Sequence, residues 1–487
     1  MRTCLWMVAA ALALVAGAAE AQAVKVKVEG GVVAGQANDR ANVFKNIPFA
    51  APPVGELRWR APQPVRPWSG IKETVQSGAT CAAAEDCLTI NVQKPAGMRP
   101  GEKLPVMVWI YGGAFTGGNS TGGFGAQHDG RMFAKQDVIT VTFNYRLGRY
   151  GWFAHPALTK EGETANFGLA DQIHALKWVR DNISQFGGNP NNVTIFGESA
   201  GAISVLTLMS SPPAQGLFHK AISESGFPRV VATPLKQAED WAVAAATKAG
   251  VTGDTPAAAR ALRALPISAF PASAGLTDPT RPYPVLDGKL IRWDVTPAFQ
   301  AGRQAKIPLM IGGNSNEASL FRPPAADWAK VTDRRDQLMR AFNPEGDKSD
   351  LQLINDLVTV QRMTEPDRNL ARIHARTGQP VYRYYFSYVT PARRATALGA
   401  AHVEEIPYVF NVLPANATPQ DHATGQAMNA YWAAFAKYGN PGAAGGVLWP
   451  KYDPARDNVL EFSNNGPVVR ERFQQAQSDY VEAGLPK

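Results

Sequence analysis

Ser199 is the residue of this chain best suited to do chemistry, because it stands at the centre of Gly-Glu-Ser-Ala-Gly, residues 197–201. Four apolar or β-favouring residues before the motif predict a short buried strand, and residues 200–210 predict a helix after it. A serine on so sharp a strand-to-helix turn takes a strained backbone conformation, and the flanking glycines leave room for it. The pattern favours a nucleophilic serine, although Gly-x-Ser-x-Gly also occurs by chance in surface turns.

The predicted helix after Ser199 points its N-terminus at the space beside the serine. The first N–H groups of a helix lack intrahelical partners and carry partial positive charge. Donors held in this way stabilise the oxyanion that forms when a serine attacks a carbonyl carbon. The motif therefore indicates acyl-transfer chemistry.

A serine nucleophile needs a base, and the base needs an orienting acid. Of the seven histidines we favour His402, because it follows a predicted strand in a loop near the C-terminus, as the order serine, acid, histidine requires. We expect His174 and His219 to lie in helices instead. Glu317 comes after a predicted strand, between Ser199 and His402, and fits the acid. On the residues alone, His402 could equally be an ordinary loop residue and Glu317 a solvated carboxylate.

The segments around these residues predict an α/β fold. Continuous apolar runs at residues 104–111 and 138–145 are typical of central parallel strands. A helix capped by Asn166 and closed by Gly187 keeps its apolar residues at steps of three and four, and it leads into the nucleophile strand. The order strand, helix, strand, turn, helix indicates a doubly wound sheet.

Other segments extend this sheet and cover it. Two helical insertions are expected over the C-terminal edge of the strands, where ligands bind in open α/β folds. These insertions span about residues 233–265 and 327–376, and the remaining predicted elements are a hairpin over residues 24–35, strands at 88–92, 307–311 and 381–389, and a helix at 426–438.

The composition indicates a compact globular enzyme, with 45% hydrophobic and 18% charged residues in a chain of 487. The net charge is +8, which could suggest nucleic acid or an anionic membrane as a partner. The basic residues are spread along the chain, however, and the densest group, Arg58, Arg60 and Arg66, is interrupted by prolines and tryptophans. We interpret them as a solvated basic surface and predict no nucleic-acid partner.

Residues 1–23 have the pattern of a secretory signal peptide. Arg2 precedes an apolar run at residues 5–17, and small-residue cleavage sites follow at residues 19–21 and 21–23. The run is shorter than the ~20 residues needed to span a bilayer, which argues against a membrane anchor. We therefore predict export to the periplasm or medium, from a bacterial source, and a single domain over residues 24–487.

The cysteines fit an exported protein. Cys4 would leave with the signal peptide, so that only Cys81 and Cys87 remain. A close, even pair in an oxidising compartment predicts a disulfide between them. With no further cysteine and no histidine nearby, a metal site is not expected here.

A series of ordered motifs spans nearly all of the predicted mature chain: NIPFAAPPVGELRWRAP, EDCLTINV, VWIYGGAF, NYRLG, NFGLADQIHALKWVRDNISQFGGNPNNVTIFGESAGA, GGNSNEASLF, GAAHVEEIPYVF and WAAFAKYGNP. So many motifs in this order resemble the type-B carboxylesterase family, which includes cholinesterases and bacterial p-nitrobenzyl esterases. The resemblance implies an α/β-hydrolase fold, a doubly wound and mostly parallel sheet with helical insertions that cover the active site.

The resemblance also implies roles for individual residues. It makes Ser199 the nucleophile, Glu317 the acid and His402 the base. It gives the three oxyanion-hole N–H donors to Gly113, Ala114 and Ala200, and it implies structural ion pairs between Arg58 and Glu85 and between Arg146 and Asp171. Ala114 stands where many relatives have a glycine. Only five residues separate Cys81 from Cys87, whereas cholinesterases carry a choline-binding aromatic in a long loop there, which argues against choline specificity.

The predicted function is hydrolysis of a small carboxylic ester through an acyl-enzyme, with no cofactor and no metal. Because the base must be neutral, activity should rise with pH around the ordinary histidine pKa of about 6.5. Two alternatives remain open. The same residues could cleave an amide, thioester or carbonate, or the chain could be a non-catalytic cholinesterase-like binding module, although such modules usually lack part of the triad.

Overall fold

The computed structural model describes residues 23–38, 41–99, 101–123, 125–229, 231–270, 278, 280–321 and 334–485. The predicted signal peptide lies outside these residues except for Ala23, and the division into a signal peptide and one domain stays a prediction. In the described part of the chain, no helix is long and apolar enough to cross a membrane.

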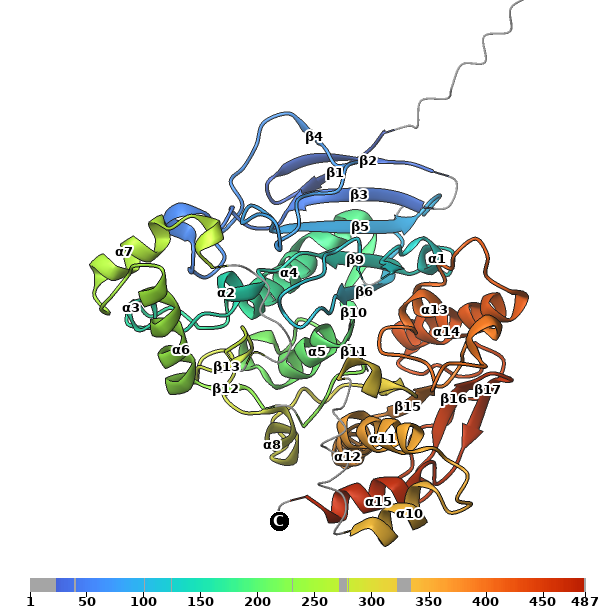
Figure 1. The fold of residues 1–487 in the computed structure, drawn as a ribbon. Helices are drawn as coiled ribbons and strands as arrows, with labels where there is room; N and C mark the ends of the chain where they lie inside the picture. Colours follow the sequence, from blue (N-terminus) through green and yellow to red (C-terminus); the bar gives the residue numbers. More distant parts are fainter. Residues whose placement is uncertain are drawn as a thin grey trace, which may run out of the picture.

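Thirteen of the described strands form one large sheet that crosses the molecule from the N-terminal to the C-terminal end of the chain (Figure 1). Its centre is parallel, and antiparallel strands flank it at both edges. The parallel strands, in spatial order, are β9 (Ile139–Phe143), β6 (Leu104–Ile110), β10 (Gly188–Glu198), β11 (Lys220–Glu224), β14 (Leu309–Asn314), β15 (Val381–Phe386) and β16 (Val459–Ser463). The flanking strands are β1 (Ala23–Val28), β2 (Gly31–Gln36), β3 (Ala41–Pro48), β4 (Ile71–Glu73) and β5 (Thr89–Pro95) on one side and β17 (Gly466–Arg470) on the other.

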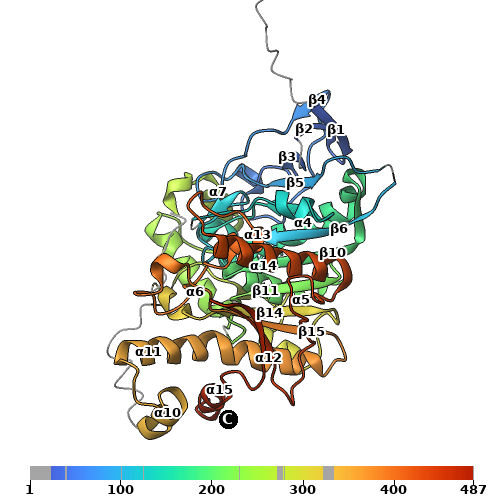
Figure 2. The ribbon, with the colours of Figure 1, turned by 90° about the vertical axis from the view of Figure 1, so that its right-hand side faces the viewer.

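Helices cover both faces of this sheet, as the doubly wound prediction requires (Figure 2). One layer holds α4 (Phe167–Asn182), α5 (Ala200–Ser210), α8 (Val295–Gln300) and α12 (Glu365–Ala375). The opposite layer holds α1 (Arg131–Ala134), α13 (Ile406–Phe410) and α14 (Pro419–Tyr438). Phe196 on β10 faces this second layer, where its ring contacts Phe133 and Phe410. The predicted α/β-hydrolase architecture is therefore confirmed.

One helix cap and one helix start differ from the prediction, and each difference has a local cause. Asn166 precedes α4, but its side chain makes no capping bond, because its amide pairs with the backbone of Val285. Helix α14 begins at Pro419 rather than at residue 426, because Thr418 and Asp421 form a reciprocal capping box.

The two helical insertions cover different parts of the molecule. The first forms α6 (Leu235–Lys248) and α7 (Pro256–Ala264), which pack around Trp59 and Tyr150. The described part of the second forms α10 (Arg335–Phe342), α11 (Asp350–Thr359), a π-helical turn η7 (Val360–Thr364) and α12. Helix α11 packs on the short turn η5 (Glu317–Leu320), and Thr359 Oγ1 accepts a hydrogen bond from Ala318 N. The second insertion thus covers the turn that carries Glu317.

Candidate active site

Ser199 lies between β10 and α5 in a backbone conformation that side chains rarely adopt, with φ 56° and ψ −122°. Its N–H donates to Glu224 O at 2.9 Å, which anchors the turn to the neighbouring strand. A Cβ atom added at Gly197 would lie 2.5 Å from Ile110 O, and one at Gly201 would lie 1.9 Å from the same atom. Both flanking positions must therefore be glycine for the turn to form.

His402 and Glu317 meet although they lie far apart in the chain. The Nδ1 atom of His402 is 2.6 Å from Glu317 Oε2, and both side chains are buried. The other oxygen, Oε1, accepts from Ser225 Oγ at 2.6 Å and from Asn314 N at 2.7 Å. The backbone of Asn316 also bonds to Ala400 O, so the two loops are joined. Glu317 is therefore fixed as a hydrogen-bonded carboxylate against the imidazole ring.

The far side of the imidazole faces another carboxylate. His402 Nε2 lies 3.0 Å from Glu198 Oε1, in an orientation that makes no hydrogen bond. No hydrogen bond joins the Ser199 hydroxyl to His402 among the described residues. The fold thus gathers Ser199, Glu198, His402 and Glu317 at one place, with the Nε2 atom turned toward Glu198.

These carboxylates change the protonation of the ring. Burial opposes protonation of His402, but the charges of Glu198 and then Glu317 outweigh burial and raise its pKa to about 10. Burial raises the pKa of the Glu198 carboxyl well above its usual range, and the positive charge of protonated His402 opposes this rise, so that the two groups favour each other's charged forms. The imidazole therefore holds its proton to higher pH than an isolated histidine would.

The loop after β6 runs beside Ser199. A Cβ atom added at Gly112 would lie 3.0 Å from Ser199 Cβ, which shows how closely the two segments approach. Gly113 has φ 112° and Ala114 has φ 55°, and within the described ranges neither amide donates a hydrogen bond to the protein. Ala200 is the first residue of α5, where the N–H has no intrahelical partner. All three predicted oxyanion donors therefore lie in backbone next to the serine.

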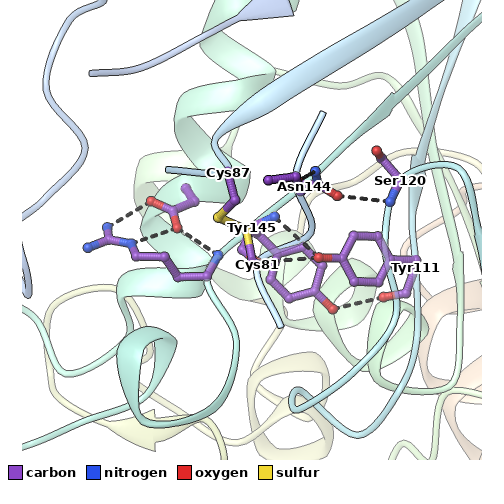
Figure 3. Close-up of a disulfide and its surroundings, with 9 residues drawn as sticks. Cys81, Cys87, Tyr111, Ser120, Asn144 and Tyr145 are labelled. Carbon is purple, nitrogen blue, oxygen red and sulfur yellow. Dashed lines mark hydrogen bonds and ion pairs between the residues drawn. A yellow bond between two sulfur atoms is a disulfide. The ribbon is translucent and has the colours of Figure 1, made fainter. Parts of the chain in front are cut away.

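Two stacked tyrosines hold the start of this loop (Figure 3). The ring centroids of Tyr111 and Tyr145 are 4.5 Å apart, and Tyr145 Oη donates to Tyr111 O at 2.8 Å. The Asn144 side chain accepts from Ser120 N at 2.9 Å, farther along the same loop. Tyr111 is 1% exposed and is structural.

The predicted disulfide is present between Cys81 and Cys87, close to this tyrosine pair (Figure 3). Both predicted ion pairs are confirmed. Arg58 Nε and Glu85 Oε1 are 2.6 Å apart, and a fully buried pair joins the Arg146 guanidinium to both oxygens of Asp171.

One prediction made from the sequence is wrong, and two residues near the site were not predicted. The prediction that His219 lies in a helix is wrong, because it precedes β11 and its Nδ1 accepts from Val193 N. Ser225 and Glu198 were not predicted at the site. The position of Glu198 inside the serine motif is the available signal in the sequence, whereas the positive φ of 56° at Ser225 is visible only in the structure. In the described part of the chain, no group of His, Cys, Asp or Glu residues is arranged to hold a metal ion.

A serine on a strand-to-helix turn, with a His–Glu pair beside it on a mostly parallel sheet, defines the class of α/β-hydrolase enzymes. The chain belongs to the carboxylesterase family, whose profile matches residues 21–481. It is 36% identical to a fumonisin B1 esterase of Sphingopyxis macrogoltabida, over 90% of this chain and 86% of the relative. It is 32% identical to a para-nitrobenzyl esterase of Bacillus subtilis, over 89% of this chain and 94% of the relative.

Solved structures agree with this membership. A carboxylesterase of Geobacillus stearothermophilus superposes with a TM-score of 0.81 at 31% identity, covering 94% of this chain and 99% of that chain. A solved PNB esterase superposes equally well at 30% identity, with the same coverage. The protein is therefore a carboxylic ester hydrolase of the serine carboxylesterase type.

Proposed function

We propose that this esterase cleaves its substrate with Ser199 as nucleophile, His402 as base and Glu317 as orienting acid. The observation that carries the proposal is the 2.6 Å contact between His402 Nδ1 and Glu317 Oε2. Because Ser225 and Asn314 hold the other oxygen of Glu317, the carboxylate keeps the imidazole in one orientation, with Nε2 free to exchange a proton.

The reaction follows from these positions. His402 Nε2 removes the hydroxyl proton of Ser199 as the oxygen attacks the ester carbonyl, and the N–H groups of Gly113, Ala114 and Ala200 bind the oxyanion. The proton on Nε2 passes to the leaving alcohol as the C–O bond breaks. Water then attacks the acyl-enzyme by the same steps, which releases the acid and restores Ser199.

The test is kcat/KM on p-nitrophenyl esters from acetate to decanoate, for the wild type and for Ser199→Ala. The substitution should lower kcat by a factor on the order of 10⁶, if the three residues act as a unit. Ser210→Ala is the matched control, since Ser210 lies on α5 and, among the described residues, its hydroxyl bonds only to Leu206 O. Equal turnover by the wild type and Ser199→Ala would refute the assignment.

The bond that is cleaved can be tested alongside. The relatives are named for fumonisin B1 and p-nitrobenzyl esters, so both are reasonable candidate substrates. Matched p-nitroanilide and thioester substrates separate an esterase from an amidase or thioesterase that uses the same residues.

We also propose that residues 1–23 are a signal peptide removed on export, which leaves one domain over residues 24–487. The Cys81–Cys87 disulfide supports this, because disulfides persist in oxidising compartments. Intact-mass measurement of the protein purified from a bacterial host should show a new N-terminus after Ala21 or Ala23. A full-length chain retained in the cytoplasm would refute export.

A further inference from the structure

A cavity of about 520 Å³ is lined in part by Phe227 and Tyr283, two residues that pack on segments of the proposed active site. Phe227 forms one wall, and its ring centroid lies 5.7 Å from that of His402. Tyr283 forms another wall and packs at 5.3 Å against Phe115, the residue directly after Ala114. One wall therefore packs on the imidazole and the other on the oxyanion loop, which places the cavity beside the proposed active site.

The described lining of this cavity is cationic. Three arginines contribute to it, Arg229, Arg281 and Arg362, and none of the described residues in the lining is acidic. These arginines come from three different segments: the loop after β11, the segment before Tyr283, and the π-helical turn η7. Their convergence is a property of the fold and not of a basic stretch of sequence.

Two of these arginines differ in whether an ion pair neutralises their charge. Arg229 is neutralised, because its Nε and one terminal nitrogen donate to the two oxygens of buried Glu365, at 2.8 and 2.5 Å. The guanidinium of Arg362 instead lies 5.2 Å from the ring of Phe321, and within the described residues it forms no ion pair. Arg362 is exposed at the cavity and keeps its full positive charge.

Phe321 connects Arg362 to the reaction centre. Its ring packs edge-on against Phe227 at 5.6 Å, and Phe227 in turn packs on His402. The Arg362 guanidinium is thus separated from the imidazole by two aromatic rings, and there it can bind an anionic group of a substrate that extends from Ser199 past Phe227. Guanidinium groups bind carboxylates with two parallel hydrogen bonds, which gives both energy and orientation.

We infer that this cavity receives a carboxylate of the substrate, so that the enzyme prefers esters carrying a free carboxylate besides the scissile ester group. The inference rests on the proposed function, since it assigns the substrate class of that same site. The carboxylate could belong to the acid half of the ester or to its alcohol half, and the test separates the two.

The experiment compares matched pairs of esters on the mature protein at low ionic strength. For the acid half, p-nitrophenyl hydrogen adipate is compared with p-nitrophenyl hexanoate. For the alcohol half, para-carboxyphenyl hexanoate is compared with para-carbamoylphenyl hexanoate. In at least one pair, we expect kcat/KM for the charged ester to exceed that of the neutral ester about tenfold, the effect of one charge-assisted contact.

Arg362→Gln should lower this ratio of charged to neutral kcat/KM about tenfold. Arg66→Gln is the control, because it removes the same charge from an exposed arginine that does not line the cavity. It should leave the ratio unchanged. Added salt should also reduce the wild-type ratio, because screening weakens a partly exposed ion pair.

If both neutral esters are hydrolysed at least as well as their charged partners, and Arg362→Gln changes neither ratio, the inference is wrong and the proposed function stands. If no ester is turned over faster by the wild type than by Ser199→Ala, the proposed function is wrong, and the inference with it.

Discussion

Glu198 Oε1 lies 3.0 Å from His402 Nε2, while Glu317 Oε2 lies 2.6 Å from Nδ1 of the same ring. The imidazole is thus held between two buried carboxylates, one on each nitrogen. Glu317 orients the ring, whereas Glu198 occupies the side from which His402 must reach Ser199. This arrangement raises the pKa of the His402 imidazole, so activity should depend on pH at higher values than it would with an isolated histidine as base.

The first prediction concerns pH. The base acts only when neutral, and the two carboxylates raise the His402 pKa, so the rising limb of kcat/KM should lie above the value of about 6.5 expected from sequence. Glu198→Gln removes one of these charges, lowers the His402 pKa and should move the limb to lower pH.

The pH profile of kcat/KM on p-nitrophenyl butyrate measures this shift. Glu224→Gln is the control, since this buried carboxyl accepts from Trp432 Nε1 and does not contact the ring. A limb that stays in place in Glu198→Gln, or moves upward, would show that Glu198 does not set the His402 pKa.

The second prediction concerns Ser225, which donates to Glu317 Oε1 at 2.6 Å. Ser225→Ala removes this bond without filling the space, so Glu317 is held less firmly and the imidazole is less well oriented. We expect kcat to fall about tenfold with KM little changed, since a hydrogen bond to a charged group contributes about 1.5–3 kcal/mol. A change in KM alone would assign Ser225 to substrate binding instead.

The third prediction concerns Ala114, whose φ of 55° is strained for any residue with a Cβ atom. Ala114→Gly should raise the free energy of unfolding by up to about 1 kcal/mol, because glycine adopts this conformation without strain. Ala202→Gly in the first turn of α5 is the control and should lower it by about 1 kcal/mol. Urea titration of both variants measures these changes in the free energy of unfolding, which should have opposite signs. Equal destabilisation of the two variants would contradict the strain argument.

The fourth prediction compares a buried and an exposed ion pair. Asp171→Asn leaves the Arg146 guanidinium, whose side chain is 3% exposed, without its counter-charge, and should destabilise the fold by about 3–5 kcal/mol. Asp181→Asn breaks the exposed pair with Arg180 and should cost less than about 1 kcal/mol. Similar losses in both variants would mean that burial does not determine the strength of these pairs.

Much of this fold could be predicted because its signals are local. The bounds of α5 follow from the apolar run and the glycines around Ser199, whereas β10 begins at Gly188, before the apolar residues that predict a strand. The candidate residues His402 and Glu317 follow from chain order and from a family resemblance that spans the chain. Helix α14 begins before the predicted residue 426, because Thr418 and Asp421 cap it at Pro419.

The sequence by itself determined the order of strands and helices and the turn at Ser199, since short-range periodicity and steric limits specify both. The candidate triad came from the order of residues along the chain and from the resemblance to a family. Only the tertiary structure decided which charges surround His402 and which arginines share a cavity. Glu198 meets the imidazole, and Arg229 meets Glu365, across separations of more than a hundred residues. Such contacts depend on how whole strands and loops pack, and no local pattern of residue types encodes that packing.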